Sequence, residues 1–240
     1  MDGGLELRRI TPEILDSLHP DDKRAVVSRR DLRRLNRIMG QARIMADMSL
    51  THLPRPPRRI LEIGGGDGSL SLAVARRLSP QWRDVTLTII DLASIIPGET
   101  RTAFASLGWT VEAIAADIFQ WAAEQPPALY DAIIANLVLH HFRDEQLQGL
   151  FRQAAGLAPV FLAAEPRRAV FSLSAARMAW VIGCNDVTRH DAVASVRAGF
   201  RDAELTRLWP AGAAVLEERQ CGLFTHVFAA SAASDRAATQ

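Results

Sequence analysis

The 240-residue sequence predicts an α/β protein built on a doubly wound, mostly parallel sheet. Short apolar, β-branched runs alternate with amphipathic stretches between residues 58 and 165, a pattern typical of parallel strands joined by helices. A glycine-rich turn directly follows the first run, and an acidic residue stands at the end of each of the first three runs. With 48% apolar and 23% charged residues, the composition is that of a globular domain and excludes a disordered chain or a coiled-coil rod.

The first strand–helix pair illustrates how the elements are assigned. The run RILEI at 59–63 is short and apolar, and the following stretch at 69–78 places Val74 and Leu78 on one helical face before Pro80 ends it. By the same criteria, further strands are expected at 85–90, within 109–115, at 130–137 and at 160–164, and further helices at 99–107 and 144–157. In such a sheet a ligand binds beyond the carboxyl ends of the strands.

The last part of the chain is expected to extend the sheet in the opposite direction. Helices are predicted at 169–182 and 191–198, followed by strands near 204–209 and within 223–229. The intervening stretch, 210–222, is short for a helical crossover, so these two strands should pair antiparallel. The sheet is therefore expected to be mostly parallel, with an antiparallel last strand.

The N-terminal segment, residues 1–52, is expected to form two or three helices outside the main core. Leu35, Ile38 and Met45 recur at helical spacing, while arginines crowd the other positions. The proline-rich connector that begins at Leu53 forbids a continuous helix. We therefore divide the chain into an N-terminal helical segment at 1–52 and a main domain at 53–240.

Charge, cysteine content and hydropathy exclude several classes of protein. The 28 basic and 27 acidic residues give a net charge of +1, so no overall field favours nucleic acid or a membrane surface. The two cysteines, Cys184 and Cys221, do not form a metal-binding or disulfide pattern. No apolar run is long enough to span a bilayer, and the first residues do not resemble a signal peptide. We expect a cytoplasmic protein.

The strongest local signal is the segment from Glu62 to Gly68, which reads Glu-Ile-Gly-Gly-Gly-Asp-Gly. Glycines allow positive φ angles and a close approach of a ligand to the backbone, and the helix that follows offers free N–H groups. A dinucleotide fingerprint would require glycine or alanine where this chain has Ser69. This argues against the rival hypothesis of a nicotinamide-dependent oxidoreductase.

The acidic residue followed by GxGxG resembles the first motif of the class I S-adenosylmethionine-dependent methyltransferases. The resemblance covers residues 58–165 and implies a Rossmann-like methyltransferase sheet with S-adenosylmethionine as cofactor. Asp91 would hold the ribose hydroxyls and Asp117 the adenine amino group, although each could instead be a helix cap. The cofactor contacts implied are Glu62, Gly64, Gly66, Gly68, Asp91, Leu92, Asp117, Ile118 and Asn136.

The segment after the fourth strand resembles small-molecule methyltransferases of the phenolic and quinone types. His140 matches the histidine that removes the phenol proton in phenolic O-methyltransferases, and His141 stands where that family has aspartate. A histidine with an ordinary pKa near 6.5 could act as a base at neutral pH. Both histidines could instead cap or pack the loop, and no acidic partner at suitable spacing makes either one a metal ligand.

Residues that would bind the acceptor are expected downstream, at Trp180, Arg189 and His190, where an apolar stretch is followed by polar groups. A helix cap and a core-facing tryptophan are the alternative. Glu165, at the end of the fifth strand, could orient the substrate or the base, or act as a cap.

The N-terminal helices at 1–52 would cover the acceptor as a lid. We expect no metal, no nucleic acid and no membrane partner, and the sequence leaves a homodimer open.

Together these observations predict a methyltransferase of secondary metabolism that acts on a small aromatic acceptor, preferably a phenolic hydroxyl of a polyketide- or quinone-like compound. Two alternatives are a C-methyltransferase of the quinone-biosynthesis type and a cofactor-binding protein without turnover.

Overall fold

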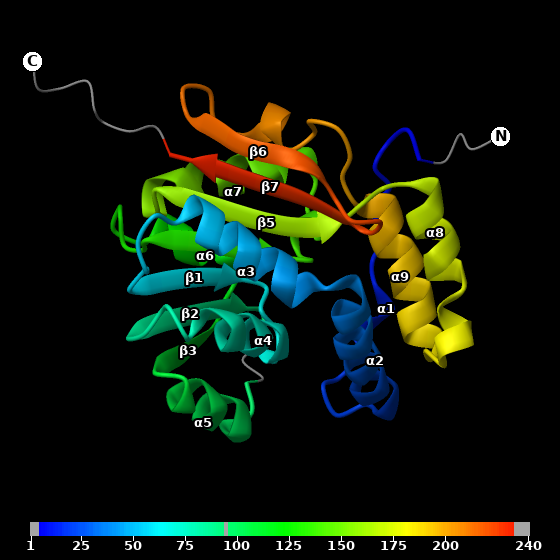
Figure 1. Cartoon of the computed structure of the whole chain (residues 1–240). Helices are drawn as coiled ribbons and strands as arrows, with labels where there is room; N and C mark the ends of the chain where they lie inside the picture. The colour runs from blue at the N-terminus through cyan, green and yellow to red at the C-terminus, as the bar shows by residue number, and fades with distance from the viewer. Residues whose placement is uncertain (1–4, 94–95, 233–240) are drawn as a thin grey trace, which may run out of the picture.

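The computed structural model describes residues 5–93 and 96–232, and it contains a seven-stranded sheet in the order β3-β2-β1-β4-β5-β7-β6 (Figure 1). Strands β1 to β5 are parallel, while β7 runs antiparallel to both of its neighbours, β5 and β6. The strands are β1 (Arg59–Ile63), β2 (Val85–Asp91), β3 (Trp109–Ala115), β4 (Ala132–Asn136), β5 (Val160–Pro166), β6 (Ala214–Cys221) and β7 (Thr225–Ser231). This confirms the predicted fold class, including the antiparallel end of the sheet.

Helices cover both faces of the sheet, and a further group lies beyond the carboxyl ends of the parallel strands (Figure 1). The α-helices are α1 (Ile14–Ser17), α2 (Lys23–Met39), α3 (Gln41–His52), α4 (Ser69–Leu78), α5 (Gly98–Ser106), α6 (Ile118–Ala123), α7 (Asp144–Leu157), α8 (Val170–Arg177) and α9 (Asp186–Ala198). Three short 3₁₀ helices are η1 (Leu139–His141), η2 (Ala179–Ile182) and η3 (Thr206–Leu208). Within the residues described, no helix is both long and apolar enough to cross a membrane.

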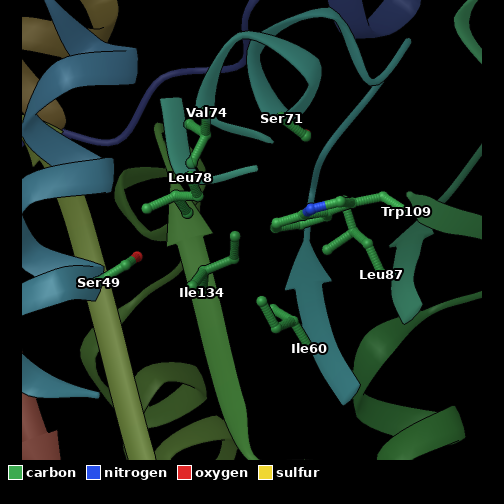
Figure 2. Close-up of a pocket in the computed structure, with 8 residues that line it drawn as sticks. All are labelled: Ser49, Ile60, Ser71, Val74, Leu78, Leu87, Trp109 and Ile134. Atoms are coloured by element: carbon green, nitrogen blue, oxygen red, sulfur yellow. The ribbon is translucent and has the colours of Figure 1, made fainter. Parts of the chain in front are cut away.

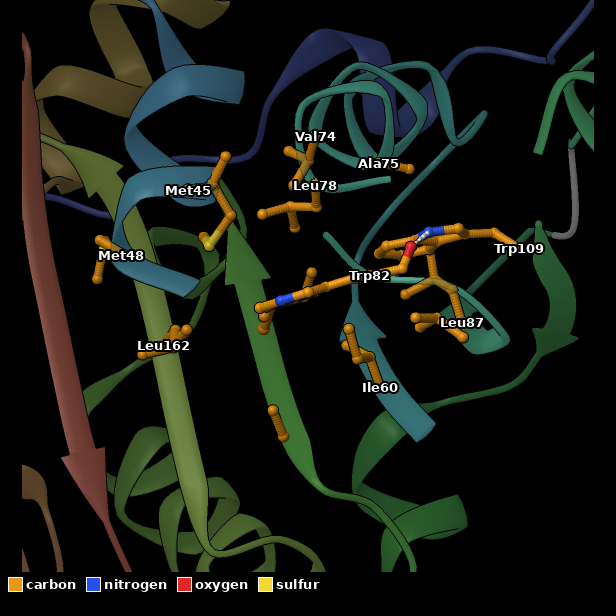
Figure 3. Packing of buried hydrophobic residues seen from close by; sticks show 14 of the residues in the cluster. Met45, Met48, Ile60, Val74, Ala75, Leu78, Trp82, Leu87, Trp109 and Leu162 are labelled. Atoms are coloured by element: carbon orange, nitrogen blue, oxygen red, sulfur yellow. Dashed lines mark hydrogen bonds between the residues drawn. The ribbon is translucent and has the colours of Figure 1, made fainter. Parts of the chain in front are cut away.

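Two hydrophobic cores form because side chains of the strands alternate between the faces of the sheet. In β2, Leu87 and Ile89 join the core under α3, α4 and α5, whereas Ile90 joins the core under α6 and α7. Figure 3 shows the first core, in which Met45 of α3 and Leu78 of α4 lie over the strands. Burial on both faces explains why these strands are nearly continuous apolar runs.

The first core contains a small cavity next to the sheet (Figure 2). Its volume is about 10 Å³, which leaves room for one water molecule at most. Its lining is mostly apolar and consists of Ser49, Ile60, Ser71, Val74, Leu78, Leu87, Trp109 and Ile134. This cavity is therefore a packing defect, and a ligand must bind elsewhere.

One N-terminal helix belongs to the core, contrary to the expectation that residues 1–52 lie outside it. Met45 of α3 is fully buried, and Ile44 and Met48 are nearly so. The periodicity of Leu35, Ile38 and Met45 indicates helix, but it runs across the break between α2 and α3 at Gly40, and it does not say which surface the apolar face covers. The segment at 1–52 therefore divides into a core helix, α3, and an outer part that contains α1 and α2.

The expected strand near 204–209 is wrong, because this stretch forms a turn and η3. Leu205 and Trp209 are both buried at a helical spacing of four, and the Glu218 carboxylate accepts hydrogen bonds from the Leu205 and Thr206 amides. The edge strand is instead β6, which lies inside the stretch at 210–222 expected to be a connection. The apolar pattern did not predict β6 because its sequence is polar, and an edge strand needs no continuous apolar run.

Three helices also differ from the expectation. The single helix expected at 169–182 is divided into α8 and η2. The short helix α6 was not predicted, and α9 begins at Asp186 rather than at 191. The side chain of Asn185 accepts a hydrogen bond from the Thr188 amide and so caps the first turn of α9.

Candidate active site

The glycine-rich loop joins β1 to α4 at the carboxyl edge of the sheet. Gly64, Gly66 and Gly68 have φ angles of 71°, 56° and 72°, which favour glycine. A Cβ atom on Gly64 would lie 2.5 Å from Cγ2 of Val138, so the segment after β4 packs directly on this loop. The sequence therefore needs glycine here for two reasons, backbone conformation and close approach.

Asp91, at the end of β2, anchors this loop. Its carboxylate accepts hydrogen bonds from the amides of Gly66, at 3.0 Å, and Ala93, at 3.2 Å. The neighbouring Leu92 exposes 80% of its surface. An acidic side chain and an exposed apolar side chain thus stand together beside the loop.

Glu62 lies beneath the loop and is almost completely buried. It accepts a hydrogen bond from the Ser71 hydroxyl. Burial raises the pKa of Glu62 to about 7, and the nearby charge of Asp91 acts in the same direction, while the Ser71 hydrogen bond opposes both. Glu62 is therefore only partly ionised at neutral pH, unlike an ordinary surface carboxylate.

Asp117 is a helix cap, as the alternative interpretation of this residue allowed. Its carboxylate accepts hydrogen bonds from the amides of Phe119 and Gln120 in the first turn of α6. Ile118, which follows it, is buried. The described contacts thus give Asp117 a structural role and do not test its expected contact with adenine.

Asn136, at the end of β4, has an unsatisfied polar atom. The residue is buried, and within the described parts of the chain its Oδ1 atom has no hydrogen-bond partner. Buried polar atoms are nearly always paired. An orphaned amide oxygen at the carboxyl edge of the sheet therefore indicates a place where a ligand supplies the missing donor.

Glu165, near the end of β5, organises the segment after β4. This fully buried carboxylate accepts hydrogen bonds from the amides of Val138, Leu139 and His140, at 3.0, 2.9 and 3.3 Å. It also pairs with Nδ1 of His140 at 2.7 Å. Glu165 thus caps η1 and orients the histidine at the same time, so both of its expected roles are present.

The other ring nitrogen of His140 faces Glu13, a residue near the N-terminus. Nε2 lies 3.5 Å from Oε1 of Glu13, and the imidazole is buried. Burial alone would lower the pKa of His140, but the hydrogen bonds and charges of Glu13 and Glu165 outweigh it and raise the pKa to about 9. This differs from the expectation of a histidine with an ordinary pKa, because the ring is positively charged at neutral pH.

His141 lies beside His140, with the two ring centres 4.3 Å apart. Its Nδ1 is 3.5 Å from a carboxylate oxygen of Asp16. One ligand-type atom from each of Glu13, His140 and His141 lies within 4.8 Å of the other two, a spacing that a metal ion would need. Because pairs with Glu165, Asp16 and the Ser195 hydroxyl already engage these side chains, we keep the expectation of no metal as a prediction.

Residues 5–17, which we call the N-terminal strap, hold this arrangement in place. Arg8 reaches the Asp144 carboxylate at 2.7 Å and the Phe142 carbonyl at 3.0 Å, and its guanidinium lies over the Phe200 ring. The Asp191 carboxylate accepts hydrogen bonds from the first two amides of α1. No sequence pattern revealed Arg8, Glu13 or Asp191 as site residues, since more than a hundred positions separate the strap from its partners.

The expected acceptor-binding residues lie farther out. Trp180 exposes 59% of its surface, so it does not face the core. Arg189 and His190 line an open hollow of about 380 Å³ between α8 and α9. Among the residues described, none of the three is a hydrogen-bond or ion-pair partner of His140, although His190 pairs with Asp191, which holds the strap.

Comparison with known sequences identifies a conserved type of domain at the centre of the chain. Residues 60–158 match the family described as "Methyltransferase domain". Uncharacterized methyltransferases of Mycobacterium tuberculosis and Mycobacterium bovis are each 34% identical over 113 residues, which are 45% of this chain and 52% of those proteins. The chain thus spans about half the length of the curated relatives it matches.

Solved structures share the fold. The plantazolicin methyltransferase BpumL, in complex with a monoazolic desmethylPZN analog and SAH, is 15% identical with a TM-score of 0.62, over 91% of this chain and 93% of that chain. An O-methyltransferase family protein from Burkholderia thailandensis is 23% identical with a TM-score of 0.56, over 90% and 61% of the two chains. The match over residues 60–158 shows a methyltransferase domain in this part of the chain, and the two solved structures, both less than 25% identical, show a shared fold.

Proposed function

We propose that this protein transfers a methyl group from S-adenosylmethionine to a phenolic hydroxyl of a small aromatic compound, such as a polyketide- or quinone-like natural product. The observation that carries the proposal is His140, a buried histidine that Glu165 holds two residues after Val138. Val138 packs on Gly64 of the glycine loop, so the histidine belongs to the same edge as the donor site. The structural neighbour from Burkholderia thailandensis, described as an O-methyltransferase family protein, supports methyl transfer to oxygen.

The donor is assigned to the glycine loop and its neighbours. When bound, S-adenosylmethionine supplies an activated methyl group. Asp91 would accept hydrogen bonds from the ribose hydroxyls, and the free amide oxygen of Asn136 would accept one from the donor's amino group. The exposed Leu92 and the helix cap Asp117 would border the adenine, while Glu62 supports the loop from below.

His140 would act as the base for the acceptor. A phenol with a pKa near 10 is a poor nucleophile until it loses its proton. The acceptor oxygen would give this proton to Nε2 of His140 and would take the methyl group that the bound donor supplies, leaving the demethylated donor as the second product. Because the pKa of His140 is about 9, Nε2 is free more often at alkaline pH, and we expect turnover to rise with pH in this range.

The outer N-terminal helices, α1 and α2, are proposed as the lid over the acceptor. Arg33 of α2 pairs with Asp67 of the glycine loop at 2.9 Å, which supports this position. Trp180, Arg189 and His190 are proposed as the outer wall of the acceptor path, which the lid and α9 would border.

Calorimetric titration with S-adenosylmethionine and with its demethylated product is the first test. We expect micromolar binding of both, followed by methylation of at least one compound in a panel of phenols and hydroxyquinones. Analysis of the product by mass spectrometry and NMR would identify the methylated atom. Donor binding without methylation of any acceptor, over a range of pH, would favour a cofactor-binding protein and contradict the proposal.

One observation favours a second function, C-methylation of a quinone-type ring. Both ring nitrogens of His140 face carboxylates, so in this arrangement neither nitrogen is free to accept a proton. Carbon methylation of an electron-rich ring can rely on alignment of donor and acceptor. A carbon-methylated product in the same screen would select this function over O-methylation.

A further inference from the structure

We infer that Glu13 is a positioning residue of this site: the N-terminal strap delivers its carboxylate to the Nε2 edge of His140, opposite Glu165, so that the ring is held from both sides. This inference rests on the proposed function, in which His140 is the base. It assigns to the strap a chemical role in addition to covering the acceptor.

The first support is how firmly Glu13 is placed. Its side chain is only 13% exposed, and the Ser195 hydroxyl of α9 donates a hydrogen bond to it. The next two residues, Ile14 and Leu15, donate their amide hydrogens to the Asp191 carboxylate at 2.8 and 3.0 Å. The carboxylate therefore reaches His140 from a backbone that α9 fixes on either side.

The second support is that the strap is also fastened to the histidine segment itself. Arg8 donates hydrogen bonds to the Phe142 carbonyl and to the Ala198 carbonyl, and it forms an ion pair with Asp144 at the start of α7. These contacts cross from the strap to η1, α7 and the end of α9. The position of Glu13 is thus coupled to the position of the histidines, as a residue of the site requires.

The third support is the balance of charge around the ring. Charged and titratable groups face His140 or its partners from each element packed there: Arg8, Glu13 and Asp16 from the strap and α1, His141 from η1, Glu165 from β5, Asp144 from α7, and His190 and Asp191 from α9. Burial would raise the pKa of Glu13, but the hydrogen bond and charge of His140 outweigh it and lower the pKa. The pair is therefore ionic, and each partner stabilises the charge of the other.

This geometry has a consequence for the acceptor. The phenolic oxygen must reach Nε2, which is the atom that Glu13 faces. Glu13 therefore fixes the orientation of the ring before the acceptor binds. When the acceptor binds, its oxygen contacts Nε2 together with the Glu13 carboxylate or in place of it. Loss of the carboxylate should leave Nε2 more accessible but less basic, so the effect on catalysis depends on pH.

The test is an NMR titration of the histidine side chains in the full chain, without acceptor. We compare the unchanged protein with Glu13→Gln and with the control Glu6→Gln, which removes an exposed carboxylate from the same strap. His140→Ala assigns the signal. We expect Glu13→Gln to lower the titration midpoint of His140 by at least one pH unit, a tenfold change in proton affinity, and Glu6→Gln to leave it unchanged.

Two further variants keep the inference testable if Glu13→Gln folds poorly. Glu13→Asp retains the charge on a shorter side chain, so the titration midpoint of His140 should stay close to that of the unchanged protein. Ser195→Ala should lower the midpoint by less than Glu13→Gln does. With an acceptor in hand, the acidic limb of the kcat/KM profile should move to lower pH in Glu13→Gln by a similar amount.

An unmoved midpoint in folded Glu13→Gln would overturn the inference, as would equal shifts in Glu13→Gln and Glu6→Gln. A midpoint that changes when Mg²⁺ or Zn²⁺ is added would also overturn it, because a cation would then occupy the Nε2 edge. Failure of the proposed function would give a different result. Turnover that survives in His140→Ala would show that His140 is not the base, but the shift of the His140 midpoint in Glu13→Gln would still be observed.

Discussion

The proposed donor side and the proposed acceptor side of this site are built in different ways. The donor side uses Glu62, the glycine loop and Asp91, which lie within 30 positions of one another on two consecutive strand–helix units. The acceptor side brings together Glu13, His140, Glu165 and Asp191 from four separate elements. Local sequence therefore specifies the first region, whereas the second exists only after the strap, η1, β5 and α9 have packed together.

The two sides also differ in what shifts the pKa of a buried group. The donor side holds a carboxylate, Glu62, whose pKa burial raises to about 7. The acceptor side holds a cation, His140, whose pKa its two carboxylate neighbours raise to about 9 against the effect of burial. Desolvation dominates in one region and ion pairing in the other, so the two regions should respond differently to mutation and to pH.

The largest effect is expected from His140→Ala. Removal of the base should lower kcat by about 10²- to 10⁴-fold, while the affinity for S-adenosylmethionine should change little, because the donor side is separate. Steady-state kinetics and calorimetry measure the two quantities. A parallel loss of donor affinity would mean that the two sides form one cooperative unit.

Protein stability should fall with rising pH in two adjoining pH ranges, or windows. In both groups the folded state binds its proton more tightly than the unfolded state does, so stability is full below the unfolded pKa and is lost as pH rises through the folded pKa. The window runs from 4.5 to about 7 for Glu62 and from 6.5 to about 9 for His140. Each is worth about 3 kcal/mol at 1.36 kcal/mol per pH unit, as an order of magnitude.

Urea unfolding between pH 4 and pH 10 would measure these windows. Glu62→Gln should abolish the loss of stability in the first pH range and leave that in the second. His140→Ala should abolish the loss in the second range and leave that in the first. A single variant that removes both windows would show that the titrations are coupled across the site.

A smaller effect is expected from Asp91→Ala. Loss of a charged, two-bond contact costs about 1.5–3 kcal/mol, which corresponds to a fall in donor affinity of roughly 10- to 100-fold. The matched control is Asp131→Ala, which also removes two backbone hydrogen bonds but at the amino end of β1. Equal donor affinity in the two variants would contradict the assignment of Asp91 to the ribose.

The smallest effect is expected from Arg33→Ala, which breaks the ion pair between α2 and the glycine loop. Arg33 is 45% exposed, and exposed pairs contribute about 0–1 kcal/mol. Donor affinity should therefore fall by less than about fivefold relative to the control Arg30→Ala. A larger loss would mean that the outer N-terminal helices close over the donor as well as the acceptor.

The fold was largely predictable from the sequence because it depends on short-range patterns. Apolar runs separated by amphipathic stretches fixed β1 to β5 and helices α4, α5 and α7 to within a few residues. The edge strand β6 was not predicted, because one of its edges is unpaired and its sequence is polar. The position of α3 in the core was also not predicted, because periodicity shows that a helix face is apolar but does not identify the surface on which that face packs.

Local sequence is enough to locate the glycine loop, Glu62, Asp91 and the histidine segment, because each lies at the end of a strand whose position follows from the local pattern. The charge state of His140, in contrast, follows from tertiary packing. Its charge depends on Glu13 and Glu165, which lie 127 and 25 positions away along the chain and within 3.5 Å in space. A pKa is set by the neighbours a group has in three dimensions, and those neighbours are chosen by packing rather than by sequence spacing.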